Sequence, residues 1–198
     1  MRSKSKSKSS SPGRFIKKLF AWVMLLFCMA LCLFLVVCIA FPLEHYEIIK
    51  KYAEEYNLEP ETVCAFINAE SHFDNEAVSH KGAKGLMQIM DKTALWAAEE
   101  IPIEDFQPED ITDPETNIRI GCWYLNRLNK QFDGDEKLIT AAYNAGSGNV
   151  TNWLYNEKYS SDGKTLDKIP YGETEKYVNK INFYKKVYKF LLKVNFYE

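Results

Sequence analysis

The stretch ESHFDNEAVSHKGAKGLMQIM, residues 70–90, decides the fold, because it separates two helical patterns and has no regular pattern of its own. Its small residues, among them Gly82 and Gly85, allow the backbone to approach a ligand closely. A polar loop between two helices, with a backbone that can approach a ligand, is typical of a segment that carries function. We therefore interpret residues 70–90 as an interhelical loop that holds a binding or catalytic site.

Helical patterns flank this loop on both sides. Pro60 suits the first turn of a helix, and Val63, Phe66 and Ile67 then fall on one face. Asp91 precedes the run KTALWAA and is expected to cap that helix. No stretch after residue 43 alternates with a period of two, so the predicted fold class is all-α. Further helices are expected after Asp113-Pro114-Glu115, after Asp133-Gly134-Asp135 and over roughly residues 173–194.

A run of 23 residues without a charged side chain, residues 19–41, lies near the N-terminus. A helix of this length measures about 34 Å, enough to cross the roughly 30 Å hydrocarbon core of a bilayer. Cys38-Ile39-Ala40 would suit a signal-peptide cleavage site. Secretory signal peptides, however, have apolar segments of only about 7–15 residues. We therefore predict an uncleaved transmembrane helix over residues 19–41.

Charge is divided between the two sides of this run. The first 18 residues carry seven basic side chains and no acidic one, whereas residues 43–198 carry 18 basic and 27 acidic side chains. Because basic flanks stay in the cytoplasm, we predict a single-pass protein with a cytoplasmic N-terminus and an extracytoplasmic domain. Residues 1–18 are rich in Ser and Lys and are expected to form a disordered basic tail.

The segment 43–198 is long enough for one globular domain with its own core. Its acidity disfavours nucleic acid as a partner, because phosphate backbones are bound by basic surfaces. Cys64 and Cys122 lie in apolar helical stretches, which favours two buried free thiols over a disulfide. The three histidines lack the spacing of a metal site, so neither a metal nor a cofactor is expected.

Glu70 enters the loop from the end of its helix, and two effects should raise the pKa of its carboxyl. Phe66, Ile67 and Phe73 are apolar neighbours that disfavour the charged form, and a helix C-terminus carries a partial negative charge. A carboxyl that stays protonated near neutral pH can act as a general acid. A glutamate that ends a helix is more often solvated or ion-paired, so this pattern alone leaves both interpretations open.

Four short motifs follow one another along the chain: Glu70-Ser71, Gly85-Leu86-Met87-Gln88, Ala142-Tyr143-Asn144-Ala145-Gly146 and Glu173-Thr174-x-x-Tyr177-Val178. Together they resemble the soluble lytic transglycosylase (SLT) domain, in the order of that family and over roughly residues 45 to 190. The resemblance implies a lysozyme-like helical fold. It also implies cleavage of the β-1,4 bond between N-acetylmuramic acid and N-acetylglucosamine in peptidoglycan, with a 1,6-anhydro-N-acetylmuramic acid end as the product.

The same resemblance implies roles for individual residues. Glu70 matches the single catalytic acid of the family, which serves first as acid and then as base. Asp91 and Ser147 stand where the family often has proline, and neither change touches the proposed acid. The residues that match substrate-binding positions are Ser71, Met87, Gln88, Tyr143, Asn144 and Tyr177.

Two other functions remain open from the sequence. One is a hydrolase of the goose-type lysozyme kind, with water as the acceptor, and the other is a non-catalytic glycan-binding scaffold of a secretion or conjugation apparatus. The expected partners are peptidoglycan glycan strands and, through residues 19–41, the lipid bilayer. A tether this close to the membrane also suggests membrane transport machinery as a partner, for which the wall would be opened locally.

Overall fold

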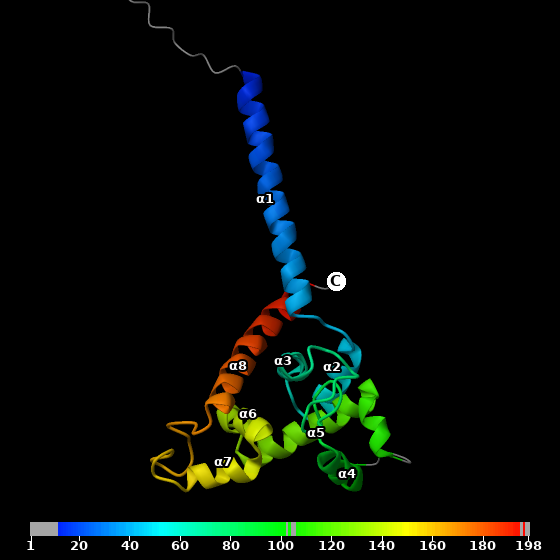
Figure 1. Cartoon of the computed structure of the whole chain (residues 1–198), viewed down its shortest axis with the longest axis vertical. Coiled ribbons are helices and arrows are strands. Elements are labelled where there is room, and N and C mark those ends of the chain that lie inside the picture. The colour runs from blue at the N-terminus through cyan, green and yellow to red at the C-terminus, as the bar shows by residue number, and fades with distance from the viewer. Residues whose placement is uncertain (1–11, 102, 104–105, 195, 197–198) are drawn as a thin grey trace, which may run out of the picture. The chain divides into compact units, whose positions relative to one another are not determined.

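The computed structural model describes residues 12–101, 103, 106–194 and 196. The chain divides into two units, with the boundary between Pro42 and Leu43, and each unit is described by itself. The first unit contains one helix, α1 (Pro12–Ala40) (Figure 1).

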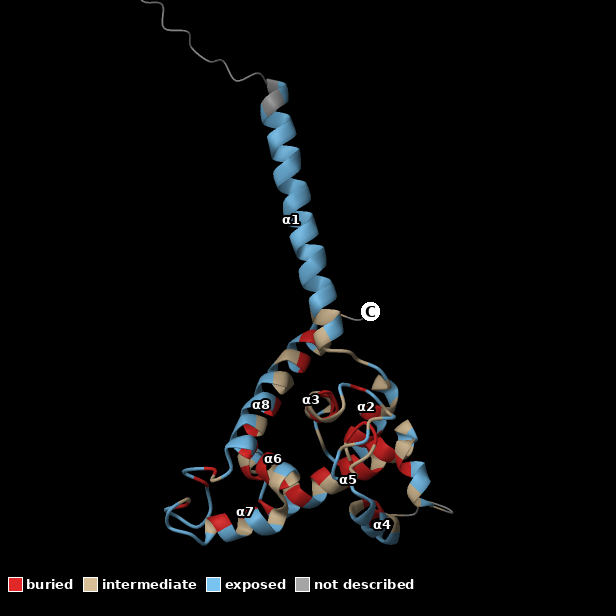
Figure 2. Cartoon of the chain, in the orientation of Figure 1, coloured by how far each residue is buried: buried red, intermediate tan, exposed pale blue. Residues whose placement is uncertain are grey.

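Helix α1 is apolar from Leu19 onward and exposed over most of its described length, with Val37, Cys38 and Ala40 intermediate (Figure 2). Its segment Phe15–Ala40 is long and apolar enough to cross a membrane by length and composition. The start of α1 at Pro12 shows that the prediction of a disordered tail over residues 1–18 is wrong for residues 12–18. Proline suits the first helical position, and Lys17 and Lys18 are good helix formers that extend the helix of the apolar run. Residues 1–11 of that predicted tail lie outside the described residues.

The second unit consists of helices joined by loops, and its described residues form no strand, which confirms the all-α prediction. Figure 1 shows these helices gathered into one domain. They are α2 (Tyr46–Glu55), α3 (Pro60–Glu70), α4 (Asp91–Glu100), the 3₁₀ helix η1 (Pro108–Thr112), α5 (Pro114–Gln131), α6 (Glu136–Ala145), α7 (Ser147–Leu154) and α8 (Gly172–Lys193).

Side-chain caps start two of these helices as the sequence predicts. The Asp113 carboxylate accepts a hydrogen bond of 2.8 Å from the Thr116 amide at the start of α5. The Asp135 carboxylate accepts one of 2.9 Å from the Leu138 amide at the start of α6. Each cap satisfies an amide that the first helical turn leaves without an intrahelical partner.

The predicted cap at Asp91 is wrong. Asp91 is the first residue of α4, and the extended residue Met90 occupies the cap position without a side-chain hydrogen bond. The carboxylate of Asp91 lies 2.8 Å from the Lys84 ammonium instead. A nearby cation in the preceding loop thus draws the carboxylate away from the helix amides.

Helix α3 lies at the centre of the domain, with Val63 to Asn68 all buried (Figure 2). It packs antiparallel to α8: the start of α3 contacts the end of α8, and the end of α3 contacts the start of α8. The ion pair between Glu61 and Lys189 marks one end of this contact, and the hydrogen bond between Glu70 and Tyr177 marks the other. The last residue of α3 is therefore fixed beside the first turns of α8.

The loop after α3 is irregular but is tied to the core by one buried side chain, Asn117 of α5. The Asn117 amide nitrogen donates to the carbonyl oxygens of Ile111 at 2.7 Å and Lys84 at 3.0 Å. Its side-chain oxygen accepts a bond of 2.8 Å from the Met87 amide. Two of these three hydrogen bonds give residues 84–87 a defined position that no helix supplies, and the third ties the same side chain to η1.

Replacing Gly85 with alanine should destabilise the domain by about 3 kcal/mol, through crowding and backbone strain. Gly85 has a φ of +74°, and an added Cβ would lie 2.3 Å from the Asn117 side-chain nitrogen and 2.9 Å from the Ile111 carbonyl oxygen. The measurement is urea unfolding of the detergent-solubilised chain, followed by tryptophan fluorescence. Gly148→Ala is the matched control, because an added Cβ there has no neighbour within 4 Å. A Gly85→Ala variant as stable as Gly148→Ala would contradict this account of the loop.

Candidate active site

Glu70 is the last residue of α3 and is half-buried at the centre of the domain. The Tyr177 hydroxyl of α8 donates a hydrogen bond to one oxygen of the Glu70 carboxylate, although the two residues are 107 positions apart in sequence. The antiparallel packing of α3 on α8 is what brings them together. The structure thus joins the predicted acid and the tyrosine of the fourth motif.

Burial raises the pKa of the Glu70 carboxyl above its ordinary value, because the charged form loses solvation. The hydrogen bond from Tyr177 and the positive charge of Lys180 favour the charged form and partly offset this effect. The predicted direction of the shift is therefore confirmed, with burial as its main cause. Among the described residues, the groups that shift this pKa include no other carboxyl group.

Aromatic rings form the wall beside Glu70. The buried ring of Phe66, one helical turn before Glu70, lies edge-on to Tyr143 at 4.8 Å and to Tyr177 at 6.2 Å between ring centroids. Tyr124 of α5 lies 5.5 Å from Tyr143. Burial raises the pKa of Tyr143 and of Tyr177 well above the ordinary value, so both hydroxyls remain neutral donors at physiological pH.

The second motif contributes through the backbone of Met87 and the side chain of Gln88. The Tyr143 hydroxyl donates to the Met87 carbonyl oxygen at 2.7 Å, while the Met87 side chain itself is fully buried. The Gln88 amide nitrogen donates to two carbonyl oxygens of the same loop, those of Ala77 and Gly85, each at 3.0 Å. Both residues therefore lie in the hydrogen bonds that shape the loop next to the acid.

Ser71 and Asn144 also bridge separate parts of the site. The Ser71 hydroxyl donates to the Leu86 carbonyl oxygen at 2.8 Å, which ties the end of α3 to the second motif. Asn144 is exposed, and its side-chain oxygen accepts a bond of 2.8 Å from the Thr174 hydroxyl in the first turn of α8. The four motifs of the sequence are thus joined into one network around Glu70.

Three residues of this network were not singled out from the sequence as site residues: Asn117, Phe66 and Lys180. Asn117 lies one turn before Gly121 on the buried side of α5. A polar residue on an otherwise apolar helix face could have identified it from the sequence, because a buried amide needs hydrogen-bond partners. Lys180 donates to the Ala69 carbonyl oxygen at 2.9 Å. Nothing in its own sequence context distinguishes it from the other lysines of α8, because its role depends on how α8 packs.

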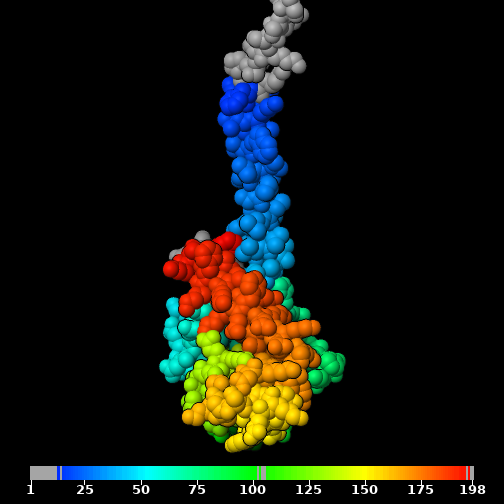
Figure 3. All heavy atoms as spheres, turned by 90° about the vertical axis from the view of Figure 1, so that its left-hand side faces the viewer, coloured from blue at the N-terminus to red at the C-terminus, as the bar shows by residue number. Residues whose placement is uncertain are grey.

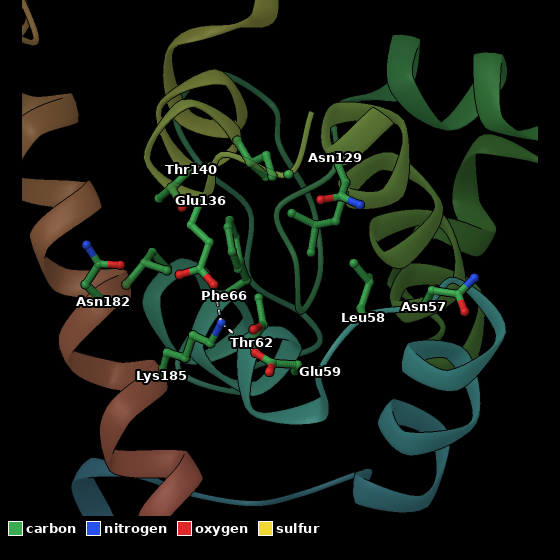
Figure 4. Close-up of a pocket in the computed structure, with 14 residues that line it drawn as sticks. Asn57, Leu58, Glu59, Thr62, Phe66, Asn129, Glu136, Thr140, Asn182 and Lys185 are labelled. Carbon is green, nitrogen blue, oxygen red and sulfur yellow. Dashed lines mark hydrogen bonds and ion pairs between the residues drawn. The ribbon is translucent and has the colours of Figure 1, made fainter. Parts of the chain in front are cut away.

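A cavity of about 190 Å³ lies behind Phe66, between α3, α5, α6 and α8 (Figure 4). Glu70 does not line this cavity. Lys185 points between Glu59 and Glu136, with ion-pair distances of 2.6 and 2.7 Å (Figure 4). Phe66 therefore lies between this cavity and the tyrosine rings beside Glu70, and the cavity does not reach Glu70.

A second hollow, of about 370 Å³, lies beside Tyr124 and extends toward the start of α7. Trp96 of α4 lines it, and the Arg127 guanidinium lies 5.2 Å from the centre of the Trp96 ring. Partly exposed aromatic rings with polar neighbours are suited to flat, amphipathic ligands. This hollow adjoins the tyrosine cluster, since Tyr124 contacts Tyr143.

The described residues contain no group of three or more histidine, cysteine or acidic side chains placed to hold a metal ion. Cys64 and Cys122 are both buried free thiols, as the sequence favours. Burial raises the pKa of both thiols, which disfavours the reactive thiolate.

Comparison with known proteins agrees with this geometry. The profile of the Transglycosylase SLT domain family matches residues 47–166. Soluble lytic murein transglycosylase of Escherichia coli K12 is 34% identical over 154 residues, which cover 77% of this chain and 24% of that protein. Membrane-bound lytic murein transglycosylase C of Yersinia pestis is 30% identical over 163 residues, which cover 72% of this chain and 46% of that protein.

A solved structure of the lytic transglycosylase Slt from Pseudomonas aeruginosa, described as an inactive mutant, superposes with a TM-score of 0.71. It is 32% identical and covers 80% of this chain and 26% of that one. The site and these similarities define a helical domain of the lytic transglycosylase class. The chain belongs to the Transglycosylase SLT domain family. It spans about a quarter of the length of the soluble relatives that it matches.

Glu70→Gln should stabilise the domain at neutral pH and lose that advantage in acid. The pKa of Glu70 is higher in the folded domain than in the unfolded chain, so ionisation of Glu70 favours the unfolded chain. The free energy of unfolding of the wild-type domain therefore falls as pH rises from the unfolded pKa through the raised folded pKa. Glutamine keeps an oxygen acceptor for Tyr177 without the charge. Urea unfolding at a series of pH values measures the difference. Glu157→Gln, at an exposed loop position, is the control and should show no such trend. Equal pH dependence in both variants would disprove the buried-acid assignment.

Proposed function

We propose that this chain is a lytic transglycosylase that cleaves the β-1,4 bond between N-acetylmuramic acid and N-acetylglucosamine in peptidoglycan. The observation that carries the proposal is the Glu70 carboxyl, half-buried, raised in pKa and hydrogen-bonded by Tyr177. Membership in the SLT family supports it, as do the names of the relatives, which are lytic murein transglycosylases.

In the first step, protonated Glu70 donates its proton to the glycosidic oxygen as the bond to C1 of the muramoyl residue breaks. The substrate's own 2-acetamido oxygen attacks C1 and takes the place of a protein nucleophile, a recognised form of substrate assistance. This route needs one carboxyl, which agrees with the absence of a second acid among the described groups that act on Glu70.

In the second step, the Glu70 carboxylate accepts the proton of the muramoyl 6-hydroxyl. The 6-oxygen attacks C1 and displaces the acetamido oxygen, so the product ends in a 1,6-anhydro ring and Glu70 is protonated again. No water is consumed. Tyr177 supports the charge on Glu70 between the two steps, because its hydroxyl donates to that carboxylate.

The other predicted site residues are proposed to position the acid and the sugar. The loop beside Glu70 is shaped by three hydrogen bonds. The Ser71 hydroxyl and the Gln88 side chain donate to carbonyl oxygens of the loop, and the Met87 backbone amide donates to the Asn117 side chain. Tyr143 holds that loop through the Met87 carbonyl. Asn144 is exposed one residue further on, where its amide is accessible to a glycan strand.

Glu70→Gln should lower the rate of peptidoglycan cleavage by at least about 10²–10⁴-fold, because one general acid–base group then fails in both steps. Digestion of purified sacculi, followed by mass analysis of the released muropeptides, measures the effect. The wild-type products should be lighter than hydrolytic products by one water, as ring closure requires.

Glu157→Gln is the matched control and should cleave at the wild-type rate, since this loop glutamate is exposed. Products that carry only reducing ends would replace the proposal with a hydrolase. Wild-type wall binding without any cleavage, unchanged in Glu70→Gln, would point to a glycan-binding scaffold.

We further propose that α1 anchors the domain in the cell membrane, with the N-terminus in the cytoplasm and the domain outside. The apolar segment Phe15–Ala40 is long enough to span a bilayer, and its basic N-terminal flank favours this orientation. A related protein bears the name membrane-bound lytic murein transglycosylase C. A tethered enzyme would act on membrane-proximal wall, where membrane transport machinery needs an opening.

The anchor predicts that the chain stays in the membrane fraction after alkaline extraction, and that protease added to spheroplasts removes the domain. A double substitution, Phe27→Arg with Leu31→Arg, should release the protein, because each arginine at mid-membrane costs about 2.5–3.5 kcal/mol. Phe27→Leu with Leu31→Ile is the matched apolar control. Release of the wild-type chain by alkali, or its full protection from protease, would refute this topology.

A further inference from the structure

Helix α8 has an exposed face that the catalytic network does not use. Phe183, Phe190 and Val194 are 58%, 62% and 49% exposed. Residues spaced by seven and by four positions lie on one side of a helix, so these three side chains share a face. The opposite side of α8, with Ile181, Tyr188 and Leu191, is buried in the core.

The charge of this helix is opposite to that of the rest of the domain. Residues 176–197 contain six lysines and no acidic residue, whereas residues 43–175 contain 12 basic and 26 acidic side chains. Lys185 and Lys189 form ion pairs with glutamates of α3, α6 and the residue before α3. Lys186 and Lys193 are exposed. We call Phe183, Lys186, Phe190, Lys193 and Val194 the basic-apolar face.

This face lies at a defined end of the domain. Figure 3 shows α8, in orange and red, along one surface of the domain. The Lys189 ammonium lies 3.6 Å from Glu61 in the first turn of α3, and the charge of Glu61 also acts on Tyr46, the first residue of α2. The last turns of α8 and the start of α2 are therefore at the same end.

The chain connects this end to α1 by a short segment. Residues 41–45 separate α1 from α2, and five extended residues reach at most about 18 Å. If α1 spans the bilayer, the start of α2 cannot move far from the membrane surface. A bilayer surface that carries anionic lipid repels the acidic remainder of the domain and attracts lysines, while exposed Phe and Val side chains can enter the interface.

We propose that the basic-apolar face of α8 docks on the surface of a bilayer that contains anionic lipid. The proposal rests on the proposed anchor and adds an orientation to it. Lys186 and Lys193 contact lipid phosphates, and Phe183, Phe190 and Val194 enter the boundary between headgroups and acyl chains. Because α3 packs antiparallel against the buried side of α8, docking lays both helices along the membrane surface, with α8 between α3 and the lipid.

The test uses the full chain in lipid nanodiscs of phosphatidylcholine, with or without phosphatidylglycerol. Lysines are acylated by a water-soluble ester, and the rate at each lysine is read by peptide mass spectrometry. Phosphatidylglycerol should slow acylation of Lys186 and Lys193 by about tenfold, and added salt should restore it. Lys164 and Lys168, exposed in the loop before α8, are internal controls and should react equally in both discs.

Phe183→Ser with Phe190→Ser should remove most of this protection, since the apolar contribution is lost while the lysines remain. Tyr155→Ser is the control, because Tyr155 is an 83% exposed aromatic residue at the end of α7, outside the basic-apolar face. Circular dichroism checks that the variants fold, and the lipid comparison on the wild-type chain does not depend on them.

Equal acylation of Lys186 and Lys193 in the two kinds of disc would overturn docking. Equal protection by soluble polyphosphate in phosphatidylcholine discs would also overturn it, because the face would then bind polyanions rather than a membrane. Incorporation into discs and cleavage of sacculi are measured on the same preparation. A chain that incorporates and cleaves, yet shows no lipid-dependent protection, therefore refutes the docking and leaves the anchor and the activity standing.

Discussion

The hydrogen bond from Tyr177 to the Glu70 carboxylate is the interaction on which the site depends. It lies where the end of α3 meets the first turns of α8, so it reports the packing of the two helices that form the centre of the domain. Burial raises the pKa of the Glu70 carboxyl, and Tyr177 together with Lys180 partly offsets that rise by favouring the ionised form. The proposed reaction, in which Glu70 both gives and recovers a proton, requires this balance.

The helical fold and most of the acid's surroundings follow from local sequence. Proline at residue 60 and capping aspartates at 113 and 135 start helices where the sequence predicts, because these signals act within one turn. The Asp91 cap failed for a reason the local pattern does not contain, namely the Lys84 ammonium that the folded loop places beside it. Tertiary contacts overrode a local preference.

The roles of Met87 and Asn117 show a similar limit. The motif marks Met87 as a site residue, yet its side chain is buried and its carbonyl makes the contact with Tyr143. Asn117 holds two backbone groups of the loop and one of η1, but its partners lie up to 33 positions away. Periodicity can identify a buried polar residue, whereas the groups that satisfy it become visible only in the folded chain.

The separation of 107 positions between Glu70 and Tyr177 has a consequence for biosynthesis. A ribosome completes α3 long before α8, and domains fold as the later segments emerge. Until α8 packs on α3, the Glu70 carboxyl lacks the Tyr177 donor. On the proposed mechanism, the nascent polypeptide is therefore inert toward glycans until α8 has been translated and has packed.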